Sequence, residues 1–275
     1  MPILTESSQW IDPDKVRRPV VTFGADVADA AGMDMDLHHH RKGEIIFVER
    51  GALACEVEGS LWTVPPRSAV WIPGGMPHSV TASGALEGYV AFVDPAVSTL
   101  LPEACCAVSV SSLLRELLLR SARLPENYDE SGPDARLVAV LLDELAVASI
   151  ENLHLPMPVD PRLRKIAELL LAMPDDRATI TAWAERIGLG ERTLARMIKR
   201  ETGMTFSRWR QQLSVMLAVK WLAGGASIQQ AASDLGYESV PSFATMFRKV
   251  LGASPGRYMA ERRVRDDDGT RAGKL

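Results

Sequence analysis

The pattern of apolar and polar residues changes character near residue 106. Between about residues 18 and 105, short runs of β-branched and aromatic residues alternate with Gly and Pro, which is typical of strands joined by tight turns. The stretch "EIIFVERGALACEVEG" has two such runs on either side of Arg50 and Gly51, and it predicts a β-hairpin. This density of short strands predicts an antiparallel sandwich or barrel.

The spacing of apolar residues becomes helical after Cys106. "VSSLLRELLLRSARL" and "DARLVAVLLDELAVASIENL" repeat apolar residues every three or four positions, and Pro133 with Asp134 can open the second helix. The prolines of residues 153–161 predict an extended, semi-rigid linker. The chain from Arg162 is predicted to be helical, and its charged end lacks apolar residues that would anchor it.

These patterns predict an α+β protein with an N-terminal antiparallel β-barrel, helices that follow it, and an all-α C-terminal domain. The predicted boundaries are a barrel at 1–106, a helical dimerisation or packing segment at 107–152, a linker at 153–161, a helical domain at 162–262 and a disordered tail at 263–275. The apolar face of the helix near residues 134–152 has two alternative packing partners, a second subunit or its own barrel.

The composition is that of a soluble globular protein, with 47% hydrophobic and 24% charged residues. No apolar run approaches the roughly 18 residues that a membrane helix needs, and the N-terminus lacks the basic-then-apolar order of a signal peptide. The cysteines form no C-x-x-C motif, so no disulfide framework is expected. We therefore expect a cytoplasmic protein with no membrane partner.

The net charge of −4 hides an asymmetry between the two halves. Residues 1–160 hold 11 Lys and Arg against 23 Asp and Glu, whereas residues 161–262 hold 16 against 9. A basic domain joined to an acidic one indicates that only the second half meets a polyanion, although chance clustering of charges is the alternative.

Three of the five histidines lie together in "LHHHRKGE", and a fourth follows in "PGGMPH". Side chains alternate between the faces of a strand, so His38 and His40 point to one side and His39 to the other. Glu44 has the same parity, and His78 follows a Pro-Gly-Gly turn that can bring it from a second hairpin. A lone H-x-H pair is more often structural, but three imidazoles and a carboxylate together favour a transition-metal site.

These residues resemble the cupin superfamily. Its first motif, G-x5-H-x-H-x3-E-x6-G, is matched at every position by Gly32, His38, His40, Glu44 and Gly51. Its second motif, G-x5-P-x-G-x2-H-x3-N, is matched at its centre by Pro73, Gly75 and His78, with Arg67 and Ala82 in place of the outer Gly and Asn. The resemblance implies a small barrel that holds one divalent Zn, Fe, Mn or Ni ion through His38, His40, Glu44 and His78. A ligand pocket without a metal is the alternative.

The basic half contains a helix-turn-helix pattern at residues 179–203. Thr181 can cap its first helix, and Ala184 and Gly188 have the spacing of a small crossing residue and a turn glycine. Leu194, Met197 and Ile198 then pack inward. The exposed face of the second helix is predicted to carry Arg192, Thr193, Arg196, Lys199 and Arg200.

The same arrangement recurs roughly 48 residues later. Ser227 can cap a helix in which Ala232 and Gly236 repeat the spacing, and Pro241 falls in the first turn of the next helix. That helix is predicted to present Ser239, Val240, Ser242, Thr245, Arg248 and Lys249 to DNA. Residues 205–223, between the two units, predict a helix about 28 Å long, close to the roughly 34 Å between successive major-groove faces.

This half resembles the DNA-binding domain of the AraC/XylS family over about 100 residues, including "LGYES…F…FRKVLGASPGRY". Guanine bases are the expected partners of Arg192 and Arg196, and phosphates those of Lys199, Arg200, Arg248 and Lys249. The second helix offers hydroxyls and Val240, so weaker base discrimination is expected from it.

Two functions fit both resemblances. The first is a transcription regulator, an activator in this interpretation and not an enzyme, which binds promoter DNA and senses a small effector or a metal ion. The layout implies a homodimer and RNA polymerase as a further partner. The second is a metal-dependent cupin enzyme, an oxygenase or isomerase with a DNA-binding appendage. Against it, the barrel region shows no second cluster of acids, tyrosines or arginines that would position a substrate.

Overall fold

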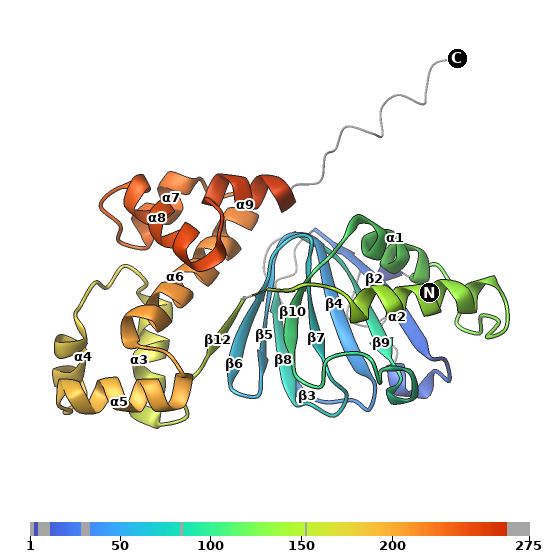
Figure 1. Ribbon diagram of the computed structural model, residues 1–275, viewed down its shortest axis with the longest axis horizontal. Coiled ribbons are helices and arrows are strands. Elements are labelled where there is room, and N and C mark those ends of the chain that lie inside the picture. Colours follow the sequence, from blue (N-terminus) through green and yellow to red (C-terminus); the bar gives the residue numbers. More distant parts are fainter. Residues whose placement is uncertain (1–2, 5–11, 29–33, 83–84, 152, 263–275) are drawn as a thin grey trace, which may run out of the picture.

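The computed structural model describes residues 3–4, 12–28, 34–82, 85–151 and 153–262. The predicted tail at 263–275 and Gly32 of the first cupin motif lie outside these residues. Two sheets and two groups of helices make up the described chain (Figure 1). This is the predicted α+β architecture, with a β-rich N-terminal half and a helical C-terminal half.

The N-terminal half is built from two sheets that face each other. The first sheet has the strand order β1-β2-β9-β4-β7-β10-β11 and the second has the order β12-β6-β5-β8-β3. Neighbouring strands are antiparallel except β1 and β2. The strands are β1 (Ile3–Leu4), β2 (Val20–Val27), β3 (Met35–His38), β4 (Gly43–Arg50), β5 (Leu53–Val57), β6 (Ser60–Val64), β7 (Ser68–Ile72), β8 (His78–Ala82), β9 (Leu86–Val93), β10 (Cys106–Ser109), β11 (Ile150–Glu151) and β12 (His154–Pro156).

The predicted hairpin around Arg50 and Gly51 is wrong. β4 pairs with β7 and β9 in the first sheet, whereas β5 pairs with β6 and β8 in the second, so this turn carries the chain from one sheet to the other. The hairpin lies one strand later, between β5 and β6, where Glu58 and Gly59 both have positive φ, as a tight two-residue turn requires. β7 and β8 likewise belong to different sheets, so the Pro-Gly-Gly turn is not a hairpin either.

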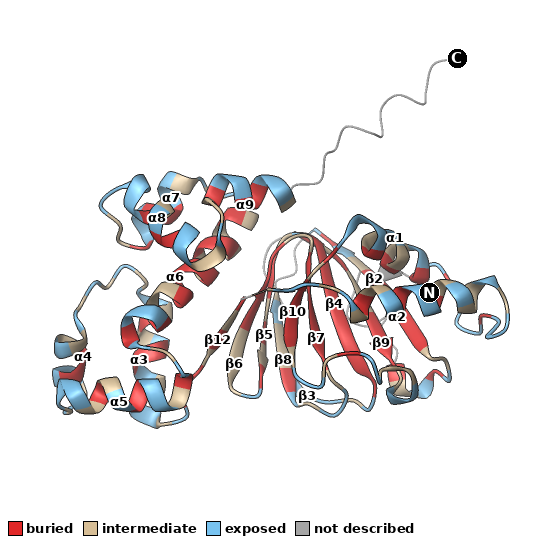
Figure 2. Cartoon of the chain, in the orientation of Figure 1, coloured by how far each residue is buried: buried red, intermediate tan, exposed pale blue. Residues whose placement is uncertain are grey.

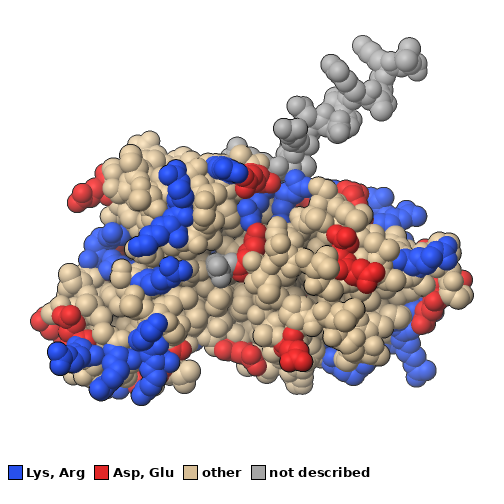
Figure 3. Space-filling view, in the orientation of Figure 1, with Lys and Arg blue, Asp and Glu red and all other residues tan. Residues whose placement is uncertain are grey.

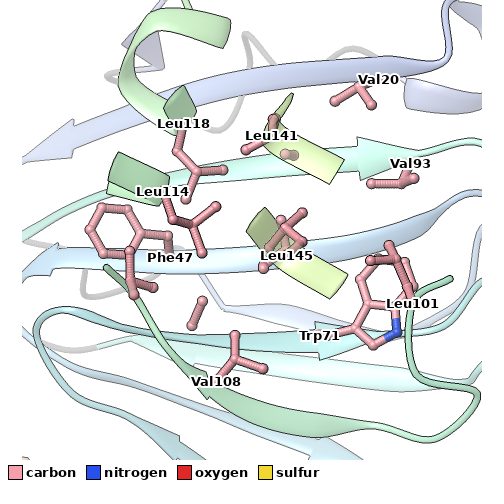
Figure 4. Close-up of a cluster of buried hydrophobic side chains, with 14 of the residues drawn as sticks. Val20, Phe47, Trp71, Val93, Leu101, Val108, Leu114, Leu118, Leu141 and Leu145 are labelled. Atoms are coloured by element: carbon pink, nitrogen blue, oxygen red, sulfur yellow. The ribbon is translucent and has the colours of Figure 1, made fainter. Parts of the chain in front are cut away.

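β4 is covered on both faces, which explains the uninterrupted apolar run at residues 45–48. Ile45 and Phe47 pack against helices outside the barrel, and Ile46 and Val48 pack between the two sheets. The outer cover consists of α1 (Ser112–Ser121) and α2 (Pro133–Ala146), whose buried leucines lie on the first sheet (Figure 4).

The inner face of α2 packs on its own barrel through Val138, Leu141 and Leu145. Its helix ends at Ala146, earlier than predicted, because the chain then forms β11 at the edge of the first sheet. The outer face keeps Val140 and Val147 exposed, at 44% and 76%. Self-packing therefore accounts for one face of α2 and leaves the other available.

The C-terminal half consists of α3 (Pro161–Ala172), α4 (Ile180–Arg186), α5 (Glu191–Thr202), α6 (Phe206–Ala223), α7 (Ile228–Asp234), α8 (Val240–Leu251) and α9 (Pro255–Arg262). The predicted helix between the two units is confirmed as α6. Its first half packs on α3, α4 and α5 through Trp209 and Leu213, and its second half packs on α7, α8 and α9 through Val219 and Leu222. Because α6 serves both units, it is buried over most of its surface (Figure 2).

The predicted linker at 153–161 contains β12, which pairs with β6 at the edge of the second sheet. The other side of β12 meets α6, where Trp209 Nε1 donates to Pro156 O at 2.8 Å and Gln212 Nε2 donates to His154 O at 3.1 Å. His154 is half-buried and stacks on Trp62 with ring centroids 4.8 Å apart. The segment is extended as predicted, but it is part of the barrel.

Candidate metal centre and nucleic-acid interface

The histidine cluster forms where the two sheets meet. His38 ends β3 and lies directly opposite His78, the first residue of β8, while Glu44 comes from β4 in the other sheet. One potential ligand atom each from His38, His40 and His78 lie within 4.8 Å of one another. His39 follows the end of β3 and is exposed. The structure therefore brings the four predicted ligands together and leaves His39 out.

Each of the three rings is held by a backbone carbonyl at Nδ1. His38 Nδ1 lies 2.7 Å from Asp36 O, His78 Nδ1 lies 2.8 Å from Met76 O, and His40 Nδ1 contacts Lys42 O. A carbonyl only accepts, so Nδ1 carries the proton and Nε2 of the neutral ring keeps its lone pair. Such outer contacts orient and activate metal-binding histidines.

Glu44 is buried between two of the imidazoles. Its carboxylate oxygens lie 2.9 Å from His78 Nε2 and 3.3 Å from His40 Nε2. These contacts lack hydrogen-bond alignment, so His40 Nε2, His78 Nε2 and Glu44 Oε1 are buried without a hydrogen-bond partner among the described residues. Buried polar atoms are rarely left unsatisfied, and three that converge on one point fit a bound cation.

In this cluster the Glu44 carboxylate and the two imidazoles beside it shift one another's pKa values. Burial by itself raises the pKa of Glu44, but His40 and His78 lower it to about 2. Burial lowers the pKa of His40 and of His78, yet the Glu44 carboxylate outweighs it and raises both above the ordinary value. Glu44 is therefore an anion that either protonated imidazoles or a metal ion can neutralise.

A buried lysine supports the turn that carries His40, and the sequence interpretation missed it. The Lys42 side chain is fully buried, and Nζ donates to Val16 O at 2.8 Å and to Arg18 O at 2.9 Å. Burial lowers the pKa of its ammonium group, and Asp94 opposes this only in part. The signal in the sequence was a lysine two residues before a glutamate that opens an apolar run, Ile45–Val48.

Replacing Lys42 by methionine should lower the free energy of unfolding by about 1–3 kcal/mol, because the two carbonyls lose their donor inside the protein. Thermal unfolding of the purified variant measures this. Lys15→Met is the matched control, since the Lys15 side chain is 81% exposed. Equal melting temperatures for the wild type and Lys42→Met would show that the buried ammonium contributes nothing to stability.

The two helix-turn-helix units have the predicted geometry with one correction. Gly188 and Gly236 adopt left-handed φ values of 68° and 70° in the turns. Ser227 caps α7 as predicted, but α4 is capped by Thr179, which accepts from Ala182 N. Thr181 lies inside α4 and donates to Glu191 instead. The helix therefore starts two residues earlier than predicted.

The exposed face of α5 is strongly basic. Arg192, Arg196, Lys199 and Arg200 are exposed, and Thr193 is half-buried beside them. The guanidinium groups of Arg192 and Arg196 make no ion pair or hydrogen bond within the described chain, whereas Arg200 lies 3.3 Å from Glu201. Figure 3 shows the basic side chains gathered at the end of the molecule occupied by α4 and α5.

The exposed face of α8 is more neutral, as predicted. Ser239 caps the helix and also donates to Ser242, and the Thr245 hydroxyl donates to Pro241 O at 2.9 Å. Val240 is 37% exposed, and Arg248 and Lys249 are exposed near the end of the helix. All three hydroxyls thus take part in hydrogen bonds within the helix and its cap.

Comparison with known proteins identifies both halves. A helix-turn-helix domain model matches residues 183–261, and a cupin domain model matches residues 27–93. Together they define a DNA-binding protein with a cupin sensor domain. The chain is 39% identical over 249 residues to the HTH-type transcriptional regulator NimR of Escherichia coli strain K12, which covers 90% of each chain. The chain therefore belongs to the AraC family of transcriptional regulators.

Two further relatives agree with this assignment. The HTH-type transcriptional activator RhaS of Escherichia fergusonii is 27% identical over 241 residues, which cover 79% of this chain and 85% of RhaS. The arabinose operon regulatory protein of Escherichia coli strain K12 is 25% identical over 142 residues, 49% of each chain. These relatives are transcriptional regulators and not enzymes, so the AraC/XylS resemblance is confirmed and the alternative of a cupin enzyme is not supported. No helix in the described ranges is long and apolar enough to cross a membrane.

Proposed function

We propose that the protein is a transcription activator that reads promoter DNA in the cytoplasm and whose cupin domain holds one divalent metal ion as signal or as part of an effector site. The observation that supports the metal is the convergence of one ring nitrogen each from His38, His40 and His78, together with His40 Nε2, His78 Nε2 and Glu44 Oε1, which are buried without a hydrogen-bond partner among the described residues. His38, His40, Glu44 and His78 are the ligands, and Zn, Fe, Mn and Ni suit their nitrogen and oxygen donors. A small effector bound beside the ion is the second possibility.

DNA recognition is assigned to α5 and α8. The guanidinium groups of Arg192 and Arg196 have no partner among the described residues and suit bidentate contacts with guanine. The surfaces that face the bases are completed by Thr193, Ser239, Val240, Ser242 and Thr245. The phosphate contacts are assigned to Lys199, Arg200, Arg248 and Lys249. α6 joins the two units as an uninterrupted helix of 18 residues, so both move as one body.

The outer face of α2 is assigned to a homodimer. Val140 and Val147 are exposed there although the inner face of the same helix is buried on the barrel. The proposed division is a barrel, a helical segment, a linker and a DNA-binding domain. The strands β10, β11 and β12 belong to the barrel, so only the residues between β12 and α3 serve as the linker. RNA polymerase is the partner that activation requires.

Removal of the metal tests this function. Purified protein should contain about one divalent ion per chain, and chelation followed by dialysis should change its affinity for the DNA upstream of its own gene. Elemental analysis and fluorescence anisotropy measure the two quantities. Protein that carries no metal when isolated, and binds none when Zn, Fe, Mn or Ni is added back, would contradict the metal assignment while leaving DNA binding in place.

A further inference from the structure

A cavity of about 670 Å³ lies between the cupin domain and the second helix-turn-helix unit. The cupin side contributes Arg67 and the start of α1, and the other side contributes the end of α8 and the helix α9. In Figure 1, α9 lies over the end of the barrel from which the chain continues into α1. The volume falls within the range of small-molecule sites.

Tyr258 places a polar group without a partner in this wall. The residue is 5% exposed, and its hydroxyl is buried with no hydrogen-bond partner within the described ranges. Buried hydroxyls of tyrosine usually find an acceptor. A hydroxyl left without one, beside a cavity, indicates that the acceptor belongs to a molecule that enters the cavity.

Arg67 occupies a position where the cupin motif has glycine. Its φ of 60° is the left-handed conformation that glycine adopts readily and arginine rarely. Its backbone is fixed there, because its N–H donates to Val48 O at 2.8 Å and its carbonyl accepts from Val110 N. The guanidinium group makes no ion pair or hydrogen bond with any described residue. Unfavourable backbone conformations of this kind concentrate at functional sites.

The N-terminus of α1 faces the same space. Ser111 caps this helix by accepting from Leu114 N at 3.0 Å, and Ser111 and Ser112 both line the cavity. The first amide groups of a helix have no partner within it and attract negative charge.

The acidic residues of the wall are already neutralised. Glu151 accepts from Arg262 and from Ser68, and Glu261 pairs with Arg257 at 2.7 Å. The charge left uncompensated in the cavity is therefore the positive charge of Arg67. Leu251 supplies apolar surface beside it.

We propose that this cavity binds a small organic anion, whose carboxylate lies between Arg67 and the N-terminus of α1, whose apolar part lies against Leu251, and whose polar edge accepts from Tyr258. Such a ligand contacts the cupin domain and the second DNA-reading unit at once. A ligand bound there would set the position of α8. The effect on DNA recognition rests on the proposed function, whereas the binding of the ligand does not.

Calorimetric titration of the full chain with benzoate, without DNA, tests the site. Benzoate should bind the wild type, and Arg67→Gly should weaken binding by about ten- to a hundredfold, the loss expected for a charge-assisted hydrogen bond. Tyr258→Phe should weaken it by a smaller factor of about two to ten. Arg67→Gly is expected to fold, because its backbone conformation suits glycine, and melting curves verify this. Arg136→Ala, an exposed arginine on α2, should bind benzoate like the wild type.

Inorganic phosphate serves as the second probe and should bind more weakly than benzoate, since it lacks an apolar part. Phosphate binding as tight as that of benzoate, with the same dependence on Arg67, would overturn the assignment to a carboxylate with an apolar body. Absence of benzoate binding at millimolar concentration, or equal binding by the wild type and Arg67→Gly, would overturn the site itself. Metal content and operator affinity are measured in separate experiments, so their results do not depend on whether benzoate binds.

Discussion

Replacing Arg196 by alanine should weaken binding to a specific operator by about 1–3 kcal/mol and change binding to random DNA far less. Arg196 lies on the exposed face of α5 and has no partner in the described protein, so its guanidinium group is free to meet two acceptors of one guanine. Because only specific complexes contain that contact, the loss should be confined to them. Anisotropy titrations with operator and with scrambled duplex at one salt concentration measure both affinities.

Arg200→Ala provides the comparison on the same helix. Arg200 is exposed one turn further along α5 and is assigned to a phosphate, so its loss should weaken both complexes by a similar factor and reduce the salt dependence. If Arg196→Ala lowered the affinity for operator and scrambled DNA equally, Arg196 would be a phosphate contact and the base-reading role would be lost.

Replacing His78 by alanine should reduce the metal content of the purified protein from about one ion per chain to a small fraction. His78 contributes the most enclosed ring of the cluster, with 1% of its side chain exposed, and its Nε2 lies 2.9 Å from Glu44. Three of the four proposed donors would remain, so the affinity for the metal ion should fall. Elemental analysis of protein purified without chelator measures the change.

His39→Ala is the control for that experiment. His39 is the neighbour of two proposed ligands but lies exposed on the opposite side of the chain, so its removal should leave the metal content unchanged. Melting curves for both variants separate loss of a ligand from loss of the fold. Full metal content in a folded His78→Ala protein would exclude His78 as a ligand and with it the proposed four-residue site.

Local patterns predicted the parts of this protein that depend on local chemistry. The spacing of Ala184 and Gly188, repeated at Ala232 and Gly236, fixed both helix-turn-helix units, because a small crossing residue and a left-handed turn leave few alternatives. The side chains of His38, His40 and Glu44 meet as predicted, although β3 ends at His38, so the alternation of side chains along a strand does not place His40. The density of short strands before residue 106 and the change to helical spacing after it were equally evident in the sequence.

The errors concern choices that depend on distant partners. Two apolar runs around a glycine are compatible with a hairpin and with a crossing between sheets, and only the pairing of β4 with β7 and β9 decides between them. The three residues of β12 are too few to show a strand pattern, and they become a strand because β6 offers a free edge. Lys42 is buried because backbone carbonyls some 25 residues away receive its ammonium group.

The position of β12 decides how the chain can be divided for study. A barrel ending before residue 153 would lack an edge strand, and the face of Trp62 on which His154 stacks would be open to water. A helical fragment beginning at residue 162 would lose the carbonyls that Trp209 and Gln212 contact. Neither half therefore keeps all the contacts that it has in the intact molecule. If a fragment failed to respond to a ligand, the lost contacts would explain the failure as well as a missing binding site would.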